Sequence, residues 1–82
     1  MLHLVQARPG LTKCKESVRP GDDVVFIGDG AICAEPIESC RVFIQVDDAK
    51  RCGVSIPTLC EPCSMSDLVE LVVKHDQSVS WR

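Results

Sequence analysis

The sequence predicts a small α/β protein with a parallel β-sheet of about four strands flanked by helices. Short apolar segments with strand character alternate along the chain with segments whose apolar residues recur at spacings of three and four, the order expected of a parallel sheet with crossover helices. The run Val24–Ile27 (VVFI) is apolar at every position, which is typical of a strand buried on both faces. The length of 82 residues fits a single domain, residues 1–82.

The first half of the chain is expected to hold two strands with a helix between them. Met1–Gln6 (MLHLVQ) carries apolar residues with a period of two, which favours a strand, and Pro9-Gly10 is expected to separate this strand from the helix that follows. Leu11–Val18 places its apolar residues on one side of a helix, and Pro20 follows its end. Val24–Ile27 is the second strand, and Ala31–Ala34 is a candidate short helix.

The second half continues the alternation of strands and helices. Its expected elements are the strand Arg41–Val46, the helical turn Asp47–Cys52, the weak strand Ser55–Leu59, the helix Asp67–His75 and the short edge strand Gln77–Trp81. Asp47 and Ser66 are the expected N-caps of the two helical segments, and Gly53 is the expected stop of the first.

Acidic residues and a glycine follow two of the expected strands. Asp29 and Gly30 come after the second strand, and Asp47 and Asp48 come after the third. Ligands of open parallel sheets bind beyond the carboxyl ends of the strands. The sequence therefore predicts that a site, if present, lies among these four residues.

Composition excludes several classes of function. The net charge of −3 and the three aromatic residues Phe26, Phe43 and Trp81 do not suit nucleic-acid binding. No apolar run approaches the length of about 20 residues that spans a bilayer. The first residues lack the features of a secretory signal, so we expect a cytoplasmic protein with reduced thiols.

Six cysteines in so short a chain are the main candidates for chemistry, and Cys14 stands first among them. Lys13 and Lys15 flank it, and neighbouring cations lower the pKa of a thiol. Cys14 is therefore the candidate persulfide site. The alternative is a cysteine packed with Leu11 and Val18 as a small apolar residue.

The other cysteines are expected to pack in the core or at the surface, except for the pair Cys60 and Cys63. Cys33 lies in an acidic and apolar stretch, Cys40 precedes a strand, and Cys52 follows Lys50 and Arg51 at the end of a helical turn, so a structural role is expected for each. Cys60 and Cys63 form a C-x-x-C, whose two thiols can join in a disulfide or bind one metal ion. A zinc site needs four ligands, and the spacing lacks the paired knuckles of a zinc ribbon, so no metal or cofactor is expected.

Two further features bear on function. His3 and His75 are the only side chains suited to acid–base chemistry near neutral pH, yet a hydrogen-bonded histidine in a strand and a partner of a helix dipole explain them simply. The last helix is expected to turn Val72 to the sheet and Val69 and Val73 outward, toward a partner protein or a second copy of the chain.

Four stretches, in order, resemble the DsrH/TusB family of the DsrE/DsrF/DsrH sulfur-relay superfamily. They are the opening MLHLV, PGDDVVFIGDG, RVFIQVDDAKRCGV and the ending SDLVELVVKHDQSVSW. The resemblance implies a flavodoxin-like fold and a complex with DsrE/TusD-like and DsrF/TusC-like subunits. Such complexes pass persulfide sulfur to a DsrC/TusE-like acceptor, either for 2-thiolation of the tRNA wobble uridine or for intracellular sulfur oxidation.

The resemblance also bears on the site residues. It places Gln45 where the DsrE/TusD subunit carries its sulfur-accepting cysteine, so this chain would lack the main site. Family members can carry a cysteine seven residues before the glycine of Gly-Asp, and Cys14 precedes Gly21 by that spacing. Residues 31–40 and the C-x-x-C depart from the family pattern.

The sequence thus predicts an accessory subunit of a sulfurtransferase complex rather than a catalyst alone. The alternative is a stand-alone dithiol redox or zinc-binding module that uses Cys60 and Cys63. A third possibility is a structural subunit whose thiols all pack.

Overall fold

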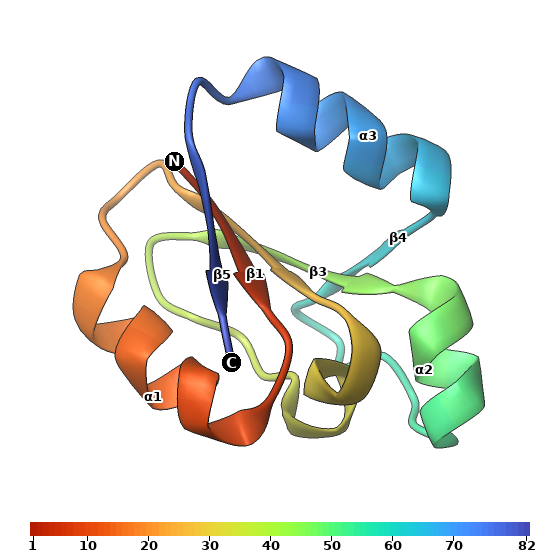
Figure 1. Ribbon diagram of the computed structural model, residues 1–82. Coiled ribbons are helices and arrows are strands. Elements are labelled where there is room, and N and C mark those ends of the chain that lie inside the picture. The colour runs from red at the N-terminus through yellow and green to blue at the C-terminus, as the bar shows by residue number, and fades with distance from the viewer.

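A computed structural model describes all 82 residues and contains one five-stranded sheet. The strands are all parallel and lie in the order β4-β3-β2-β1-β5 (Figure 1). Their bounds are β1 Leu2–Val5, β2 Asp23–Phe26, β3 Arg41–Gln45, β4 Glu61–Cys63 and β5 Ser78–Trp81. The predicted parallel α/β sheet is confirmed, with β5 as the short edge strand expected near the end. The strand order differs from the 2-1-3-4-5 of flavodoxin itself.

Helices cover both faces of this sheet, as Figure 1 shows. Their bounds are α1 Arg8–Ser17, the 3₁₀ helix η1 Gly28–Cys33, α2 Val46–Cys52 and α3 Met65–Lys74. The connections from β1 to β4 all step in one direction, so right-handed crossovers put α1, η1 and α2 on one face. The connection from β4 returns across the sheet to β5, which puts α3 on the opposite face. None of these helices has the length and apolar character that crossing a bilayer requires.

The two faces carry separate cores. On the α1 side, Val24 and Phe26 of β2 pack in a cluster of 11 buried residues. On the α3 side, Val25 packs in a cluster of five that includes Leu71 of α3. The alternation along β2 follows from the two-residue period of a strand, and it makes every residue of VVF a core residue.

Helix α1 begins earlier than the sequence suggested. Pro9 and Gly10, expected to separate the first strand from the helix, lie inside its first turn. Proline fits there because its fixed φ suits a helix start and its missing N–H is not needed. A Cβ at Gly10 would collide with the backbone of Trp81, so the absence of a side chain lets α1 rest directly on β5.

The caps of the two later helices also differ from expectation. Gln45, not Asp47, caps α2, and Ser64, not Ser66, caps α3 in a capping box with Asp67. Gly53 ends α2 in the left-handed conformation, as predicted.

The fourth strand lies outside the segment expected to form it. Ser55–Leu59 has no strand structure, and β4 is formed by Glu61–Cys63, within the C-x-x-C segment. Glu61 pairs with Phe43 and Cys63 pairs with Gln45 of β3. Pairing with β3 therefore fixes this strand, whose own sequence (EPC) has little strand propensity.

Candidate functional site

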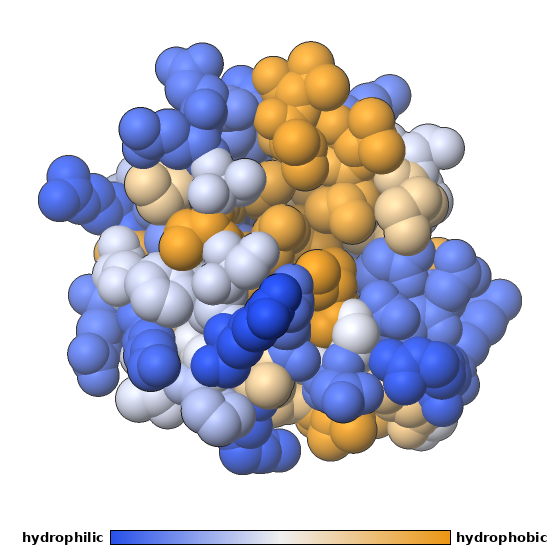
Figure 2. Space-filling view, in the orientation of Figure 1, coloured by the Kyte–Doolittle hydropathy of each residue, from blue (hydrophilic) through white to orange (hydrophobic).

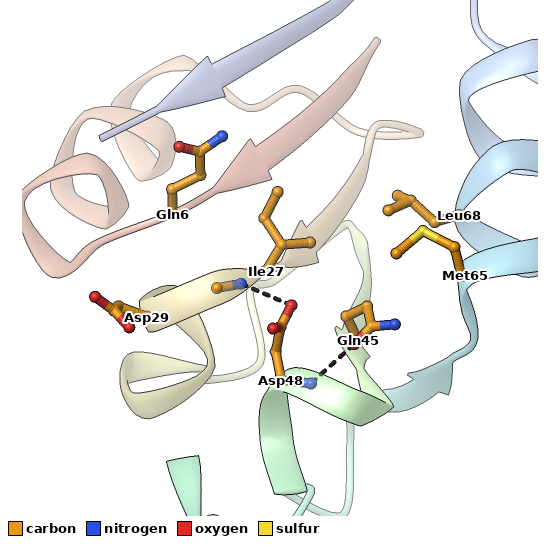
Figure 3. A pocket seen from close by; sticks show the side chains of 8 residues that line it. Gln6, Ile27, Asp29, Gln45, Asp48, Met65 and Leu68 are labelled. Carbon is orange, nitrogen blue, oxygen red and sulfur yellow. Dashed lines mark hydrogen bonds between the residues drawn. The ribbon is translucent and has the colours of Figure 1, made fainter. Parts of the chain in front are cut away.

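The candidate site is a crevice at the carboxyl end of the sheet, where neighbouring strands send their connections to opposite faces. β3 leads into α2 on one face, and β4 leads into α3 on the other. Ligands of open parallel sheets bind in crevices of this kind. The cavity measures about 400 Å³ (Figure 3). Its lining residues are Gln6, Ile27, Gly28, Asp29, Gln45, Asp48, Met65 and Leu68.

The polar wall of the crevice is fixed by hydrogen bonds between the ends of β2 and β3. The side-chain Oε1 of Gln45 accepts a hydrogen bond from the backbone N–H of Asp48 at 2.8 Å. Oδ2 of Asp48 accepts one from the backbone N–H of Gly28, also at 2.8 Å. Gly28 has a φ of 55°, a left-handed conformation that glycine adopts without strain. The three residues therefore hold one another in place.

The rim of the crevice carries two acids and one base. The Arg51 guanidinium lies 3.5 Å from a carboxylate oxygen of Asp29 and 3.5 Å from one of Asp48. Asp29 and Arg51 are both largely exposed, so solvent weakens their attraction. The rim is left slightly acidic.

The opposite wall is apolar and comes from the first turn and a half of α3. Figure 3 shows Met65 and Leu68 facing Ile27 across the crevice. Ile27 and Leu68 are half-buried, whereas Met65 is 59% exposed. The crevice is therefore amphipathic, and its apolar side continues onto the solvent-facing surface of α3.

The only ionisable side chains that line the crevice are the carboxylates of Asp29 and Asp48. None of its lining residues is a cysteine, serine, histidine or lysine, the side chains that most often attack a substrate or move its protons. Asp29 and Asp48 lie here as the sequence predicted, but Gly30 and Asp47 do not line it. Such an arrangement suits the recognition of a partner or ligand.

The structure places Cys14 away from this crevice, in the core under α1. Its side chain is 0% exposed. Burial raises the pKa of the Cys14 thiol to about 11, and the neighbouring Cys40 and Asp22 add to the rise. The expectation that Lys13 and Lys15 lower this pKa is wrong, because both lysines lie on the exposed side of the helix. Cys14 occupies the packed position that the sequence left open as the alternative.

Three other thiols also pack against the α1-side core. Cys33 is buried, and its thiol donates to the Gly30 carbonyl. Cys40 and Cys52 are half-buried neighbours of the same core. Burial raises the pKa of both Cys33 and Cys40.

The C-x-x-C cysteines lie on opposite faces of the sheet. Cys60 packs in the α1-side cluster and Cys63 in the α3-side cluster. Both thiols are free and buried, and burial raises the pKa of each. A dithiol or zinc module using this pair therefore does not fit the structure. No group of three or more histidine, cysteine, aspartate or glutamate side chains is arranged to hold a metal ion.

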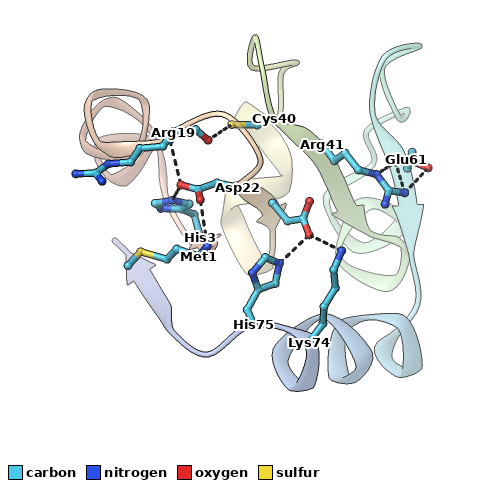
Figure 4. Close-up of polar contacts among 10 residues, drawn as sticks. Met1, His3, Arg19, Asp22, Cys40, Arg41, Glu61, Lys74 and His75 are labelled. Atoms are coloured by element: carbon cyan, nitrogen blue, oxygen red, sulfur yellow. Dashed lines mark hydrogen bonds and ion pairs between the residues drawn. The ribbon is translucent and has the colours of Figure 1, made fainter.

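A hydrogen-bonded network around Asp22 was not predicted from the sequence (Figure 4). Its carboxylate accepts hydrogen bonds from His3 Nε2 at 2.9 Å, the Arg19 backbone N–H at 3.0 Å and the Met1 ammonium at 3.1 Å. Burial acts to raise the pKa of Asp22, but these hydrogen bonds outweigh it and lower the pKa to about 2.

His3 is the buried, satisfied histidine that the sequence suggested. The Trp81 indole N–H donates to His3 Nδ1 at 3.0 Å, which leaves Nε2 as the nitrogen that donates to Asp22. The larger cavity beside it, about 590 Å³, is lined in part by His3, Val79 and Trp81. Since both ring nitrogens are engaged, His3 offers no free base to this cavity.

The neighbouring Asp23 contacts the carboxyl-terminal end of α3, on the opposite face of the sheet. Figure 4 labels its two partners, Lys74 and His75. Oδ2 of Asp23 lies 2.8 Å from His75 Nε2 and 3.7 Å from the Lys74 ammonium. His75 is thus a partner of a buried carboxylate. Consecutive polar residues at the start of a buried strand were the available sequence signal, but their partners are 19 and 52 positions away.

A scan against models of protein families and a search of curated proteins find no match to this chain.

Proposed function

We propose that the chain is an accessory, non-carrier subunit of a cytoplasmic sulfur-relay complex. It works beside DsrE/TusD-like and DsrF/TusC-like subunits, which pass persulfide sulfur to a DsrC/TusE-like acceptor for tRNA 2-thiolation or sulfur oxidation. The assignment to this kind of complex rests on the ordered sequence resemblance. The accessory role rests on the strand-end crevice, which no cysteine lines and which therefore offers no thiol to carry sulfur.

Gln45 supports the non-carrier role. The resemblance aligns it with the sulfur-accepting cysteine of another subunit. Gln45 is the last residue of β3 and lines the crevice. It is 2% exposed, and its amide is occupied by Asp47 and Asp48. An amide cannot hold persulfide sulfur, and a carrier needs an accessible thiolate. In this proposal the sulfur stays on the partner subunits.

The exposed face of α3 supports a role in assembly. Four apolar side chains on this face form what we call the α3 surface: Met65, Val69, Val72 and Val73. They are 59%, 55%, 45% and 80% exposed. Val72 was expected to face the sheet, and its exposure enlarges the outward apolar stripe. Figure 2 shows apolar side chains gathered over α3 and continuing toward the centre of the view. Contiguous exposed apolar surface of this kind marks protein–protein contact sites.

The test is co-purification of the chain with co-expressed DsrE-like and DsrF-like subunits. Val73→Asp puts a charge in the α3 surface and is expected to abolish the complex while leaving the fold intact. Leu59→Asp is the matched control, because Leu59 is 76% exposed but lies outside α3. A wild-type chain that binds neither subunit, or equal loss of binding in both variants, contradicts the proposal.

A further inference from the structure

The two edges of the sheet differ in how they are protected against pairing with another strand. β4 is three residues long, and its central residue, Pro62, has no N–H to donate. Arg41 and Glu61 also place an ion pair across this edge. β5 has the sequence SVSW, with no proline and no charge. Short strands, prolines and charges are the usual protection of an edge, so only the β5 edge is open.

The hydrogen bonds to β1 show which backbone groups of β5 are free. The Leu2 N–H donates to the Gln77 carbonyl at 3.1 Å, and the Gln6 N–H donates to the Trp81 carbonyl at 2.8 Å. The backbone N–H and C=O groups of the odd-numbered residues of β5 therefore point toward β1. Because successive residues alternate, the N–H and C=O groups of Ser78 and Ser80 point away from the sheet. Both serines are exposed, and their small side chains leave room for another strand.

We propose that a second copy of this chain pairs here, with its β5 antiparallel to the first about a two-fold axis at Val79. In this register Ser78 lies opposite Ser80 of the second copy, and Ser80 lies opposite Ser78. Each is a hydrogen-bonded pair that exchanges two N–H···O bonds, so the free groups of both strands are satisfied. The dimer has one continuous ten-stranded sheet, and its interface is isologous.

Charge and packing select the same register. Asp76 and Arg82 flank β5, and the proposed pairing sets Asp76 of each copy opposite Arg82 of the other. The Asp76 side chain has no hydrogen-bond or ion-pair partner within its own chain, and the one hydrogen bond of the Arg82 side chain runs from Nε to the Gln6 side chain. If the two β5 strands paired two residues out of this register, Asp76 would no longer lie opposite Arg82 of the other copy. Val79 is half-buried and meets Val79 of the second copy at the axis, on the side of the 590 Å³ cavity.

The pairing is expected to be weak and concentration-dependent, because two four-residue strands bury less area than a stable interface. It uses none of the α3 surface and does not depend on the proposed relay function. A chain that fails to bind relay subunits can still form this dimer, and the reverse also holds.

Sedimentation velocity over a range of concentrations tests the pairing. The wild-type chain is expected to show a monomer–dimer equilibrium. Ser80→Pro removes an outward N–H but none of the bonds to β1, so it is expected to give a folded monomer. Ser78→Ala is the matched control, since it keeps every backbone group and is expected to keep the dimer. A wild-type monomer at the highest concentration, or a dimer that survives Ser80→Pro, overturns the proposal.

A charge exchange tests the register. Asp76→Arg and Arg82→Asp each convert two attractive contacts per dimer into repulsive ones, so each is expected to weaken dimerisation by roughly tenfold. The double variant Asp76→Arg/Arg82→Asp restores the attraction and is expected to return the dimer to near wild-type affinity. A double variant as weak as either single variant overturns the assigned register. Circular dichroism on every variant separates lost pairing from lost folding.

Discussion

The two faces of the sheet bury different numbers of core residues. The face under α1, η1 and α2 holds a cluster of 11 buried residues, including Phe26 and Cys14. The opposite face holds five, and α3 is the only helix over it. The difference follows from topology, because three crossovers pack on one side and only the return from β4 to β5 packs on the other. The α1 side thus contributes most of the buried apolar area that stabilises the fold. The α3 side leaves apolar side chains of α3 exposed, where a partner can contact them.

The cysteines divide in the same way. Cys14, Cys33 and Cys60 are buried in the larger cluster, and only Cys63 lies in the smaller one. A domain of this size buries a smaller share of its surface than a large one, so its stability depends strongly on each residue of the core. Most thiols of this chain therefore serve as packing residues of the face that stabilises it.

The largest effect is expected from cavities made in the two cores. Phe26 is 0% exposed, so Phe26→Ala is expected to reduce the free energy of unfolding by about 3–5 kcal/mol. Leu71 is 9% exposed and packs in the smaller cluster, so Leu71→Ala is expected to cost about 2 kcal/mol, at the low end of such changes. Urea unfolding measures both values.

Hydrogen exchange sharpens this comparison. Leu71→Ala is expected to speed exchange in α3 before the rest of the chain, because α3 rests on the smaller core. If both variants lose the same free energy of unfolding and exchange uniformly, the two faces contribute equally to the stability of the fold.

The sequence was sufficient for the parts of the fold that are set locally. The buried run VVF, the period of two in β1 and the αL stop at Gly53 each reflect one stretch of chain and were predicted correctly. Glu61–Cys63 was missed, because its strand exists only through its pairing with β3. Pro9-Gly10 predicts a break, but proline suits the first turn of a helix and the contact with β5 requires the glycine, so both residues lie inside α1.

The position of the candidate site could be predicted from the sequence, but the chemistry of its side chains could not. The topology rule placed it at the strand ends, where Asp29 and Asp48 do line the crevice. The sequence neighbours of Cys14 suggested an activated thiol, but lysines one position away on a helix point elsewhere, and burial decides the pKa. Burial depends on contacts from distant segments, which local sequence does not show.

A smaller effect is expected from replacing Asp22. Its carboxylate accepts a hydrogen bond from His3 of β1, whereas the neighbouring Asp23 contacts His75 at the end of α3. The pKa of Asp22 is lowered from 3.8 to about 2, so the folded state favours the charged form. Its contribution is fully present above pH 3.8 and is lost as the pH falls through 2. Asp22→Asn is expected to cost about 1–2 kcal/mol at pH 7 and little near pH 2.

Unfolding free energies of the wild type and Asp22→Asn, measured between pH 7 and pH 2, check this. Asp29→Asn is the control, because Asp29 is 77% exposed and its loss is expected to change stability little at any pH. Curves for the wild type and Asp22→Asn that stay parallel down to pH 2 would show that the hydrogen bonds around Asp22 do not favour its charged form.

The smallest effect is expected where the sequence suggested the most chemistry. Cys14 is fully buried and has a pKa of about 11, so its thiolate is scarce at neutral pH and no reagent reaches it without opening of the fold. Alkylation at pH 7.5 with peptide mapping is expected to label the half-buried Cys52 well before Cys14. Intact mass after incubation with a persulfide donor is expected to show no added sulfur on Cys14. Urea at a denaturing concentration serves as the control, since it should make both thiols label at similar rates. Rapid labelling of native Cys14, or stoichiometric added sulfur that disappears in Cys14→Ser, would show that this thiol is accessible and reactive. The chain would then be a sulfur carrier rather than an accessory subunit.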